Sequence, residues 1–164
     1  MELLSDVNLT EMCKALHIPL HYIGFKDTFA KHTPKDGAYI VNLDSKKDNR
    51  GGTHWTAFIL TNHKALYFDP FGLTIPLPTR QFIMRYKPTR ILFSTNQIQQ
   101  IDSVLCGYFC LYFLYFFTVL NKINDNLPYL INKHDSLYVQ GNRTLNDKII
   151  QELTRRIFRV QRGR

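Results

Sequence analysis

Apolar residues recur at helical spacing near both ends of the chain. In the first segment they lie three or four positions apart, which predicts a short amphipathic helix capped by Asn8. This face contains Leu9, Met12, Cys13 and Leu16. A second amphipathic helix is predicted over 144–162, where basic side chains crowd the polar face. Its apolar face contains Leu145, Ile149, Ile150, Leu153 and Ile157.

Between these two helices, apolar and aromatic residues form runs of strand length. Residues 37–43 predict a buried strand, and residues 89–94 predict a further strand. Residues 53–60 and 64–69 are separated by a few turn residues, which predicts a β-hairpin. Residues 44–52 predict an exposed polar loop. Helices at both ends with strands between them indicate the α+β class.

The longest apolar run, "VLCGYFCLYFLYFFTVL", covers 104–120 and carries no charge. Its 17 residues only reach the lower limit of the roughly 17–25 that a membrane-spanning helix needs. Its three tyrosines would leave their hydroxyls unpaired in lipid. A helix that is apolar on every side belongs inside a domain, so the run predicts a buried central helix and no membrane contact.

Composition and charge restrict the class of protein. With 164 residues, 45% of them hydrophobic, residues 1–164 can form a single domain with its own core. Lys and Arg outnumber Asp and Glu by 21 to 13, which suits either a polyanionic partner such as nucleic acid or a solvated basic surface. Three cysteines without an N-terminal apolar targeting segment indicate a reducing compartment and no secretion. The histidines show no metal-ligand spacing, so no metal is expected.

Four residues can supply the parts of a thiol-based catalytic site. A nucleophilic thiol needs a base, a group that orients the base, and donors for the developing oxyanion. The candidates are His54, Asp69, Gln99 and Cys106. Each one taken alone also has a structural interpretation, such as a small buried cysteine or an aspartate that begins a turn.

The predicted hairpin brings two of these candidates together. If its turn pairs Thr61 with Lys64, then His54 faces Phe71, and Asp69 lies on the same face one diagonal step away. A register slip of two residues would set the histidine and the aspartate directly opposite each other. A slip of one residue would send them to opposite faces and break the arrangement.

Cys106 stands where a polar segment gives way to the apolar run. There the first unpaired amides of the predicted helix and its macrodipole favour a thiolate. Gly107 leaves room for substrate beside the sulfur, and the amide of Cys106 can point at an oxyanion. Either Gln99 or Gln100 can supply the second oxyanion donor.

Together these motifs resemble the adenovirus-type cysteine endopeptidases, which are related to the SUMO and ubiquitin-like-specific proteases. The motifs are "GGTHW", then "YFDPFG", then "QQIDSVLCGYFC", with "AYIVNL" ahead of the histidine. The resemblance implies a papain-like α+β fold of the adenovirus protease type, in which a mixed sheet packs against a central helix that carries the nucleophile.

The resemblance also implies roles for the four candidates. His54 becomes the general base, Asp69 its orienting acid, Gln99 the oxyanion donor and Cys106 the nucleophile. The family more often has Glu in place of Asp69. The adenovirus pattern places the glutamine seven positions ahead of the cysteine and selects Gln99, whereas the SUMO-type pattern places it six ahead and selects Gln100.

Further expectations follow from the resemblance. Gly52, Trp55 and Gly107 would bind substrate. The enzyme would cleave viral capsid or core precursor proteins during virion maturation, within the virion and the nucleus of the infected cell, as a monomer that needs no cofactor for the chemistry. DNA, bound without sequence specificity, and a short viral peptide would be activators. In the adenovirus enzyme the peptide is tethered through a cysteine, and "RYKPTRILFST" contains none, so a disulfide-linked peptide is not expected.

Two other functions fit the same residues. One is a protease or acyltransferase that acts on ubiquitin-like modifiers, with the same fold and the same nucleophile. The other is a catalytically inactive DNA-binding virion protein.

Overall fold

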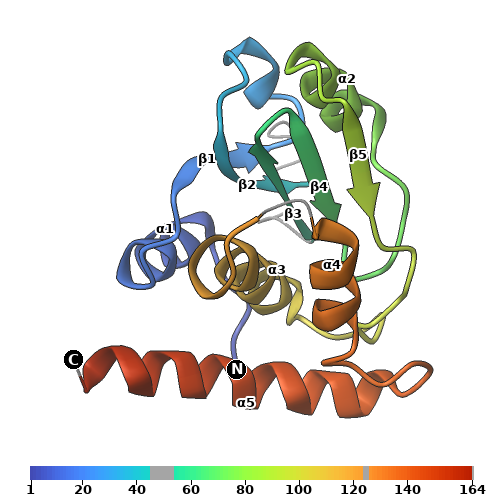
Figure 1. Ribbon diagram of the computed structural model, residues 1–164. Coiled ribbons are helices and arrows are strands. Elements are labelled where there is room, and N and C mark those ends of the chain that lie inside the picture. Colours follow the sequence, from blue (N-terminus) through green and yellow to red (C-terminus); the bar gives the residue numbers. More distant parts are fainter. Residues whose placement is uncertain (45–53, 124–125, 164) are drawn as a thin grey trace.

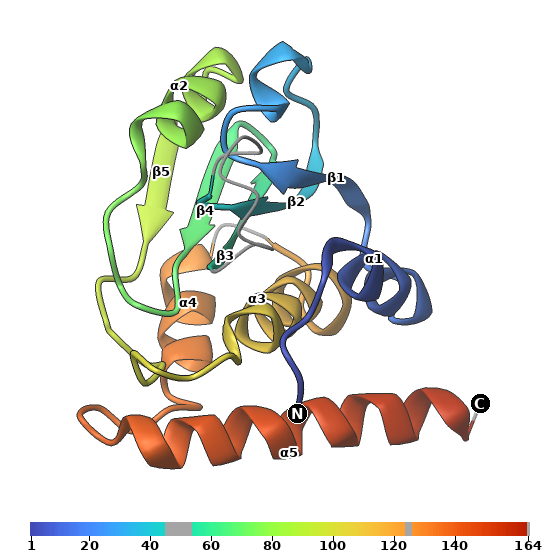
Figure 2. The ribbon, with the colours of Figure 1, turned by 180° about the vertical axis from the view of Figure 1, so that it is seen from behind.

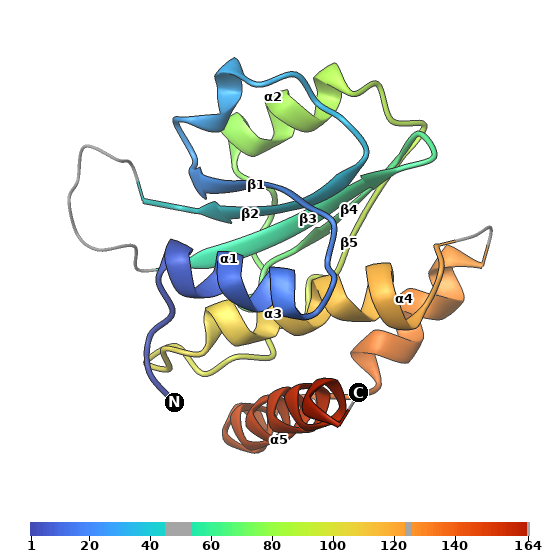
Figure 3. The same ribbon diagram turned by 90° about the vertical axis from the view of Figure 1, so that its left-hand side faces the viewer.

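Helices cover both faces of a five-stranded sheet in the computed structural model, which describes residues 1–44, 54–123 and 126–163. Figure 3 shows helix α2 on one face and α1, α3 and α4 on the other, with α5 beneath α3. The helices are α1 (Asp6–Ala15), the short η1 (Phe29–Lys31), α2 (Leu77–Arg85), α3 (Cys106–Tyr115), the π-helical turn η3 (Phe116–Leu120), α4 (Leu127–Asp135) and α5 (Arg143–Arg162).

The sheet is mixed, and its strands follow chain order from β1 to β5 (Figure 1). The central strands pair antiparallel, while each edge strand runs parallel to its neighbour. The strands are β1 (Leu20–Phe25), β2 (Gly37–Asn42), β3 (Trp55–Thr61), β4 (Lys64–Phe68) and β5 (Arg90–Phe93). Together with the helices on both faces, this sheet confirms the predicted α+β class and the mixed sheet.

Two hydrophobic cores lie on opposite sides of the sheet. Along β3, Ala57 and Ile59 join the core shared with α1, α3 and α5, while Phe58 and Leu60 join the core under η1 and α2. Because both faces of β3 are covered, the strand is apolar along nearly its whole length and does not alternate.

Helix α3 is the predicted central helix, and all its residues are buried. It begins at Cys106, packs mainly against β3 and continues into the π-helical turn η3. Among the described residues, no helix has the length and apolar character that crossing a membrane requires.

The N-terminal helix begins earlier than predicted. Ser5 is its N-cap, and Asn8 stands three residues inside, where Ser5 and Asn8 exchange side-chain to backbone hydrogen bonds. The prediction that Asn8 caps the helix was therefore wrong, because Asn8 belongs to the same capping box but on its helical side.

The buried face of α5 differs from the predicted one at its first position. Leu145 is 39% exposed, and Asn146 is buried in its place. The Asn146 side chain accepts a hydrogen bond from the Val139 amide and donates to the carbonyls of Val139 and Ile98. A fully hydrogen-bonded amide can be buried at little cost, so hydrophobicity alone misassigned this position, while Ile150 and Ile157 are buried as predicted.

Candidate active site

His54 and Asp69 form a buried, directly hydrogen-bonded pair. His54 directly precedes β3, and its carbonyl accepts from the Leu43 amide at 2.9 Å, which continues the ladder between β2 and β3. Asp69 directly follows β4. The distance from His54 Nε2 to Asp69 Oδ1 is 2.7 Å, and the aspartate side chain is fully buried.

The register of the hairpin explains this contact. Thr61 pairs with Lys64, and the pairing runs without a slip to Ala57 and Phe68. The two turn residues, Asn62 and His63, both have positive φ, as a tight two-residue hairpin turn requires. The predicted register is therefore the observed one, and neither slipped alternative occurs.

The turn after β4 fixes the aspartate. Asp69 Oδ1 also accepts from the Phe71 amide at 2.8 Å, and the Asp69 carbonyl accepts from the Gly72 amide at 2.8 Å. Gly72 has φ +69, and a Cβ there would lie 2.6 Å from the Thr95 carbonyl oxygen. Only glycine fits at this position, both for its conformation and for the close approach of the neighbouring segment.

The imidazole of His54 lies between a carboxylate and an aromatic ring. Phe71 stacks on it with ring centroids 4.2 Å apart and an interplanar angle of 14°. Burial opposes the charge of the ring, but the hydrogen bond to Asp69 and the nearby Cys106 outweigh burial and raise the pKa of His54 to about 9. The protonated ring is therefore favoured at neutral pH.

Cys106 is the first residue of α3 and is 1% exposed. It lies close enough to His54 to raise the pKa of the imidazole, although Nδ1 of His54 has no formed hydrogen bond with any described residue. Because Nε2 is taken by Asp69, Nδ1 is the nitrogen left to serve the thiol. The amides of Tyr108 and Phe109 both donate to the Leu105 carbonyl, so the helix ladder starts only beyond Cys106 and Gly107.

Gln99 and Gln100 differ in burial and in hydrogen-bond partners. Gln99 is fully buried, its side-chain NH₂ donates to the Ser103 carbonyl at 2.8 Å, and its Oε1 has no partner among the described residues. Gln100 is half-buried, and its Oε1 accepts from the Thr144 hydroxyl of α5 at 2.9 Å. Gln99 thus lies beside the segment that leads to Cys106, while the Gln100 side chain is bonded to α5.

Backbone hydrogen bonds connect the segment that contains Gln99 and Gln100, here called the glutamine segment, to the turn that begins at Asp69, here called the acidic turn. The amides of Ile98 and Gln99 both donate to the Pro70 carbonyl, at 3.0 and 3.1 Å. This connection brings the glutamine segment next to the turn that carries Asp69, although 29 positions separate Gln99 from Pro70 in the sequence.

The predicted substrate-binding residues are placed as follows. Trp55 is buried, and its indole N–H donates to the Leu4 carbonyl at 2.9 Å. The prediction that Gly107 leaves room for substrate differs from the structure, because Leu4 and Trp55 occupy this space and their atoms would lie 3.2 and 3.5 Å from a Cβ at that position. Gly52, like most of the predicted loop over 44–52, lies outside the described residues.

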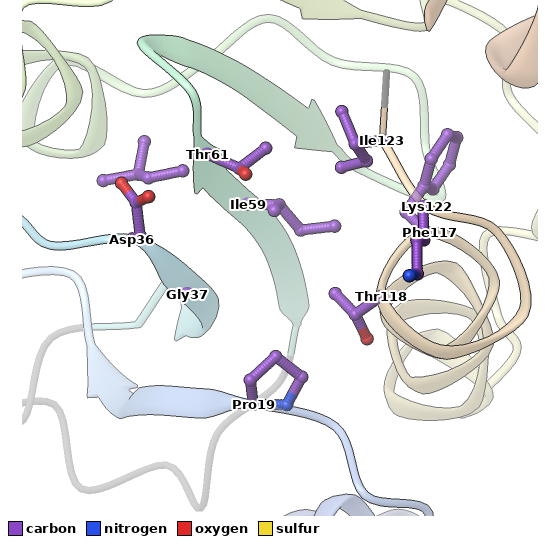
Figure 4. Close-up of a pocket in the computed structure, with 10 residues that line it drawn as sticks. Pro19, Asp36, Gly37, Ile59, Thr61, Phe117, Thr118, Lys122 and Ile123 are labelled. Carbon is purple, nitrogen blue, oxygen red and sulfur yellow. The ribbon is translucent and has the colours of Figure 1, made fainter.

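Other features of the described residues lie apart from this site. No three His, Cys, Asp or Glu side chains among them gather in a way that could hold a metal ion. A cavity of about 340 Å³ lies at the opposite ends of β3 and α3, lined by Pro19, Ile59, Thr61, Phe117 and Lys122 among others (Figure 4). Thr61 lies seven residues after His54 along the extended chain of β3, which corresponds to roughly 20 Å. This cavity is therefore separate from the site.

The sequence of the chain is similar to that of a known protease. No family model matches the chain. The chain is 32% identical over 120 residues to the protease of Frog adenovirus 1, a match that covers 60% of this chain and 57% of the relative. The chain resembles an adenovirus protease. This similarity confirms the resemblance drawn from the motifs, and it spans little more than half of the adenovirus protease.

One solved structure shows a shared fold. The central domain of an uncharacterized Legionella pneumophila protein superposes with a TM-score of 0.51 at 17% identity, over 100% of both chains. A crystal structure of an ASFV protease gives a TM-score of 0.43 at 17% identity, over 68% of this chain and 57% of that one. At 17% identity the likeness to the Legionella domain concerns the fold alone.

Two residues that contact the site, Phe71 and Leu4, were not predicted to do so. The sequence placed Phe71 opposite His54, but its stacking on the imidazole was not anticipated. Leu4 reaches Trp55 and Gly107 from a segment with no periodic pattern. The capping pair of Ser5 and Asn8, which fixes the chain directly after Leu4, was the available signal for a defined segment there.

Proposed function

We propose that the chain is a cysteine peptidase in which Cys106 is the nucleophile and His54 its base. The hydrogen bond of His54 to Asp69, with Cys106 beside the ring at the head of a helix, carries the proposal. Similarity to the protease of Frog adenovirus 1 supports peptide hydrolysis as the reaction.

In the first step, the Cys106 thiolate attacks the carbonyl carbon of the scissile peptide bond. The carbonyl oxygen becomes an oxyanion, which the Cys106 amide and the Gln99 side-chain NH₂ stabilise. One N–H of Gln99 already donates to Ser103, so the second one is the donor for the oxyanion. The His54 imidazolium gives the Nδ1 proton to the leaving nitrogen, the C–N bond breaks, and a thioester remains on Cys106.

In the second step, neutral His54 takes a proton from water, and the resulting hydroxide attacks the thioester. The C–S bond breaks, the acid product leaves, and the thiolate and imidazolium are restored. Asp69 keeps the imidazole oriented and stabilises its charge throughout, because its Oδ1 is held by both His54 and the Phe71 amide.

The proposed substrates are capsid or core precursor proteins, cleaved during virion maturation in the virion and the infected cell. The likeness to a viral protease supports this role. A reducing compartment is proposed for this enzyme, in which the three free cysteines remain thiols.

DNA is proposed as a non-specific partner, bound through the basic side of α5. Exposed arginines follow this helix, and Glu152 forms surface ion pairs with two of them. The exposed basic residues are Arg143, Lys148, Arg155, Arg156, Arg159 and Arg162. Binding through phosphate contacts predicts that affinity falls steeply as the salt concentration rises.

Replacement of the nucleophile tests the proposal. Purified protein is incubated, with and without DNA, with the precursor proteins of its own virus, and the products are identified by mass spectrometry. Cys106→Ala should lower cleavage by at least about 10⁴-fold, because no other group forms the thioester. Cys13→Ala removes a different buried thiol and should retain cleavage.

Other outcomes would redirect the proposal. Cleavage by Cys106→Ala at the wild-type rate would remove Cys106 as the nucleophile. Inactivity of the wild-type protein on precursors, with release of ubiquitin-like modifiers from conjugates, would assign the same residues to a modifier protease. Full function of the Cys106→Ala protein in virions would favour an inactive DNA-binding protein.

A further inference from the structure

Residues 1–5 form an irregular segment, here called the strap, that runs from α1 past α3 (Figures 2 and 3). Trp55, the neighbour of His54, donates its indole N–H to the Leu4 carbonyl at 2.9 Å. A Cβ on Gly107, the neighbour of Cys106, would lie 3.2 Å from both Cβ and Cδ1 of Leu4. Leu4 therefore contacts the neighbours of both the base and the nucleophile.

Met1 and Glu2 of the strap also lie near the start of α3. Met1 lines a depression of about 320 Å³ together with Ser103, Val104 and Leu105, the three residues before Cys106. Burial raises the pKa of the Tyr108 phenol, and the nearby Glu2 raises it further. The strap thus borders the nucleophile from the residues before it to the second residue after it.

The attachments of the strap are uneven. At one end, Ser5 is fixed by hydrogen bonds with Asn8, which include the two side-chain to backbone bonds of the capping box at 3.0 and 3.1 Å. Beyond that anchor, Leu3 is 46% exposed, while Leu4 is only 7% exposed. Leu4 therefore supplies the buried side chain and the carbonyl that attach the strap beside Gly107 and Trp55, and Ser5 anchors the end of the strap next to α1.

We propose that the strap is a gate on the candidate active site, and that Leu4 must leave Gly107 before a substrate can reach Cys106. This inference rests on the proposed function, because it assigns the strap to the same nucleophile. Such a gate populates its open state on the order of 0.1–10% of the time. The apparent affinity for substrate is then reduced by the open fraction.

Alkylation of Cys106 measures the open fraction without a substrate. The native protein is treated with a bulky maleimide, and peptide mapping by mass spectrometry gives a separate rate for each cysteine. Cys13 and Cys110 are buried in the core, so they report global unfolding in the same sample.

Two variants weaken the strap in different ways. Leu4→Ala removes the side chain from Gly107 and should raise the labelling rate of Cys106 roughly tenfold, since most of one leucine's burial is lost. Trp55→Phe keeps an aromatic ring but removes the donor to the Leu4 carbonyl, and should raise the rate roughly threefold. Leu3→Ala is the matched control, because Leu3 is the neighbouring strap residue and is half exposed.

Kinetics give a second readout. Since KM contains the open fraction, Leu4→Ala should lower KM by the factor by which it raises the labelling rate, with kcat unchanged. Leu4→Met, which restores an apolar side chain of similar volume, should return both values toward wild type.

Two results overturn the gate. One is a Cys106 labelling rate that stays within about twofold of wild type in both strap variants. The other is an equal rise at Cys13, Cys106 and Cys110, which would mean that Leu4 only supports the fold. The labelling experiment needs no peptidase activity, so failure of the gate is distinguishable from failure of the proposed function.

Discussion

The two sides of the candidate active site are held in different ways. His54 and Asp69 lie at the ends of one hairpin, where five consecutive residue pairs from Ala57 to Thr61 fix their register. Gln99 lies on an irregular segment whose amides donate to the Pro70 carbonyl, and Cys106 begins a buried helix that packs mainly against β3. The base side is thus a product of local pairing, and the nucleophile side a product of long-range contacts.

This difference predicts where each side is vulnerable. On the base side, one altered hydrogen bond leaves the ladder intact, so chemistry can be lost without loss of the fold. On the nucleophile side, the Pro70 carbonyl accepts hydrogen bonds from the amides of Ile98 and Gln99. The Asn146 side chain donates to the Ile98 carbonyl. Loss of such a contact should change the position of a catalytic group as well as stability.

The largest expected effect after loss of the nucleophile is from Asp69→Asn. The carboxamide can still accept from the Phe71 amide, but its NH₂ would donate to Nε2 of His54 and place the ring proton on Nδ1. The ring could then not accept the thiol proton, and kcat should fall by about 10³–10⁴-fold. Steady-state kinetics measure the loss.

Circular dichroism and urea unfolding provide the control for this variant. The hairpin register does not depend on the charge of Asp69, so the fold should be retained. A kcat within tenfold of wild type in a folded Asp69→Asn protein would remove Asp69 from the mechanism.

A smaller effect is expected from the glutamines, which provide a matched pair. Gln99→Ala removes the proposed oxyanion donor and should lower kcat by roughly 10²-fold. Gln100→Ala removes only a surface hydrogen bond to Thr144 and should leave kcat within about twofold. The reverse order in kcat would assign the oxyanion donor to Gln100.

The smallest effect is on the pH dependence of stability. The folded protein holds the His54 proton up to a pKa of about 9, whereas the unfolded chain releases it near the ordinary value of 6.5. Stability from this charge is therefore complete below pH 6.5 and is lost as the pH rises through about 9. The upper limit is about 3 kcal/mol.

Urea unfolding of wild type and His54→Gln between pH 6 and pH 9.5 measures this contribution. Titrating groups that do not contact His54 are common to both proteins, so they cancel in the difference between the two free energies of unfolding. A difference that does not change over this range would contradict the imidazolium next to Asp69.

The base side could be predicted from the sequence because its determinants are local. Two apolar runs and a short turn fixed the pairing of Thr61 with Lys64, and the two-residue period of a strand then placed Asp69 beside His54. The central helix could be predicted for a similar reason, since its apolar residues are contiguous.

The nucleophile side was less predictable. The choice between Gln99 and Gln100 depends on Pro70 and Thr144, which are 29 and 44 positions away from them. Strand β1 and helices α2 and α4 were not predicted either. Both helices are short and carry a proline in the first turn, where the missing amide is tolerated although proline commonly signals a break.

The glycine in the turn after Asp69 also constrains how this protein can be altered. Gly72 meets the backbone of Thr95 and Asn96 with no room for a methyl group. An insertion or deletion in either segment would therefore need a compensating change in the other. For protein engineering, the acidic turn and the glutamine segment are one unit that must be transplanted or redesigned together.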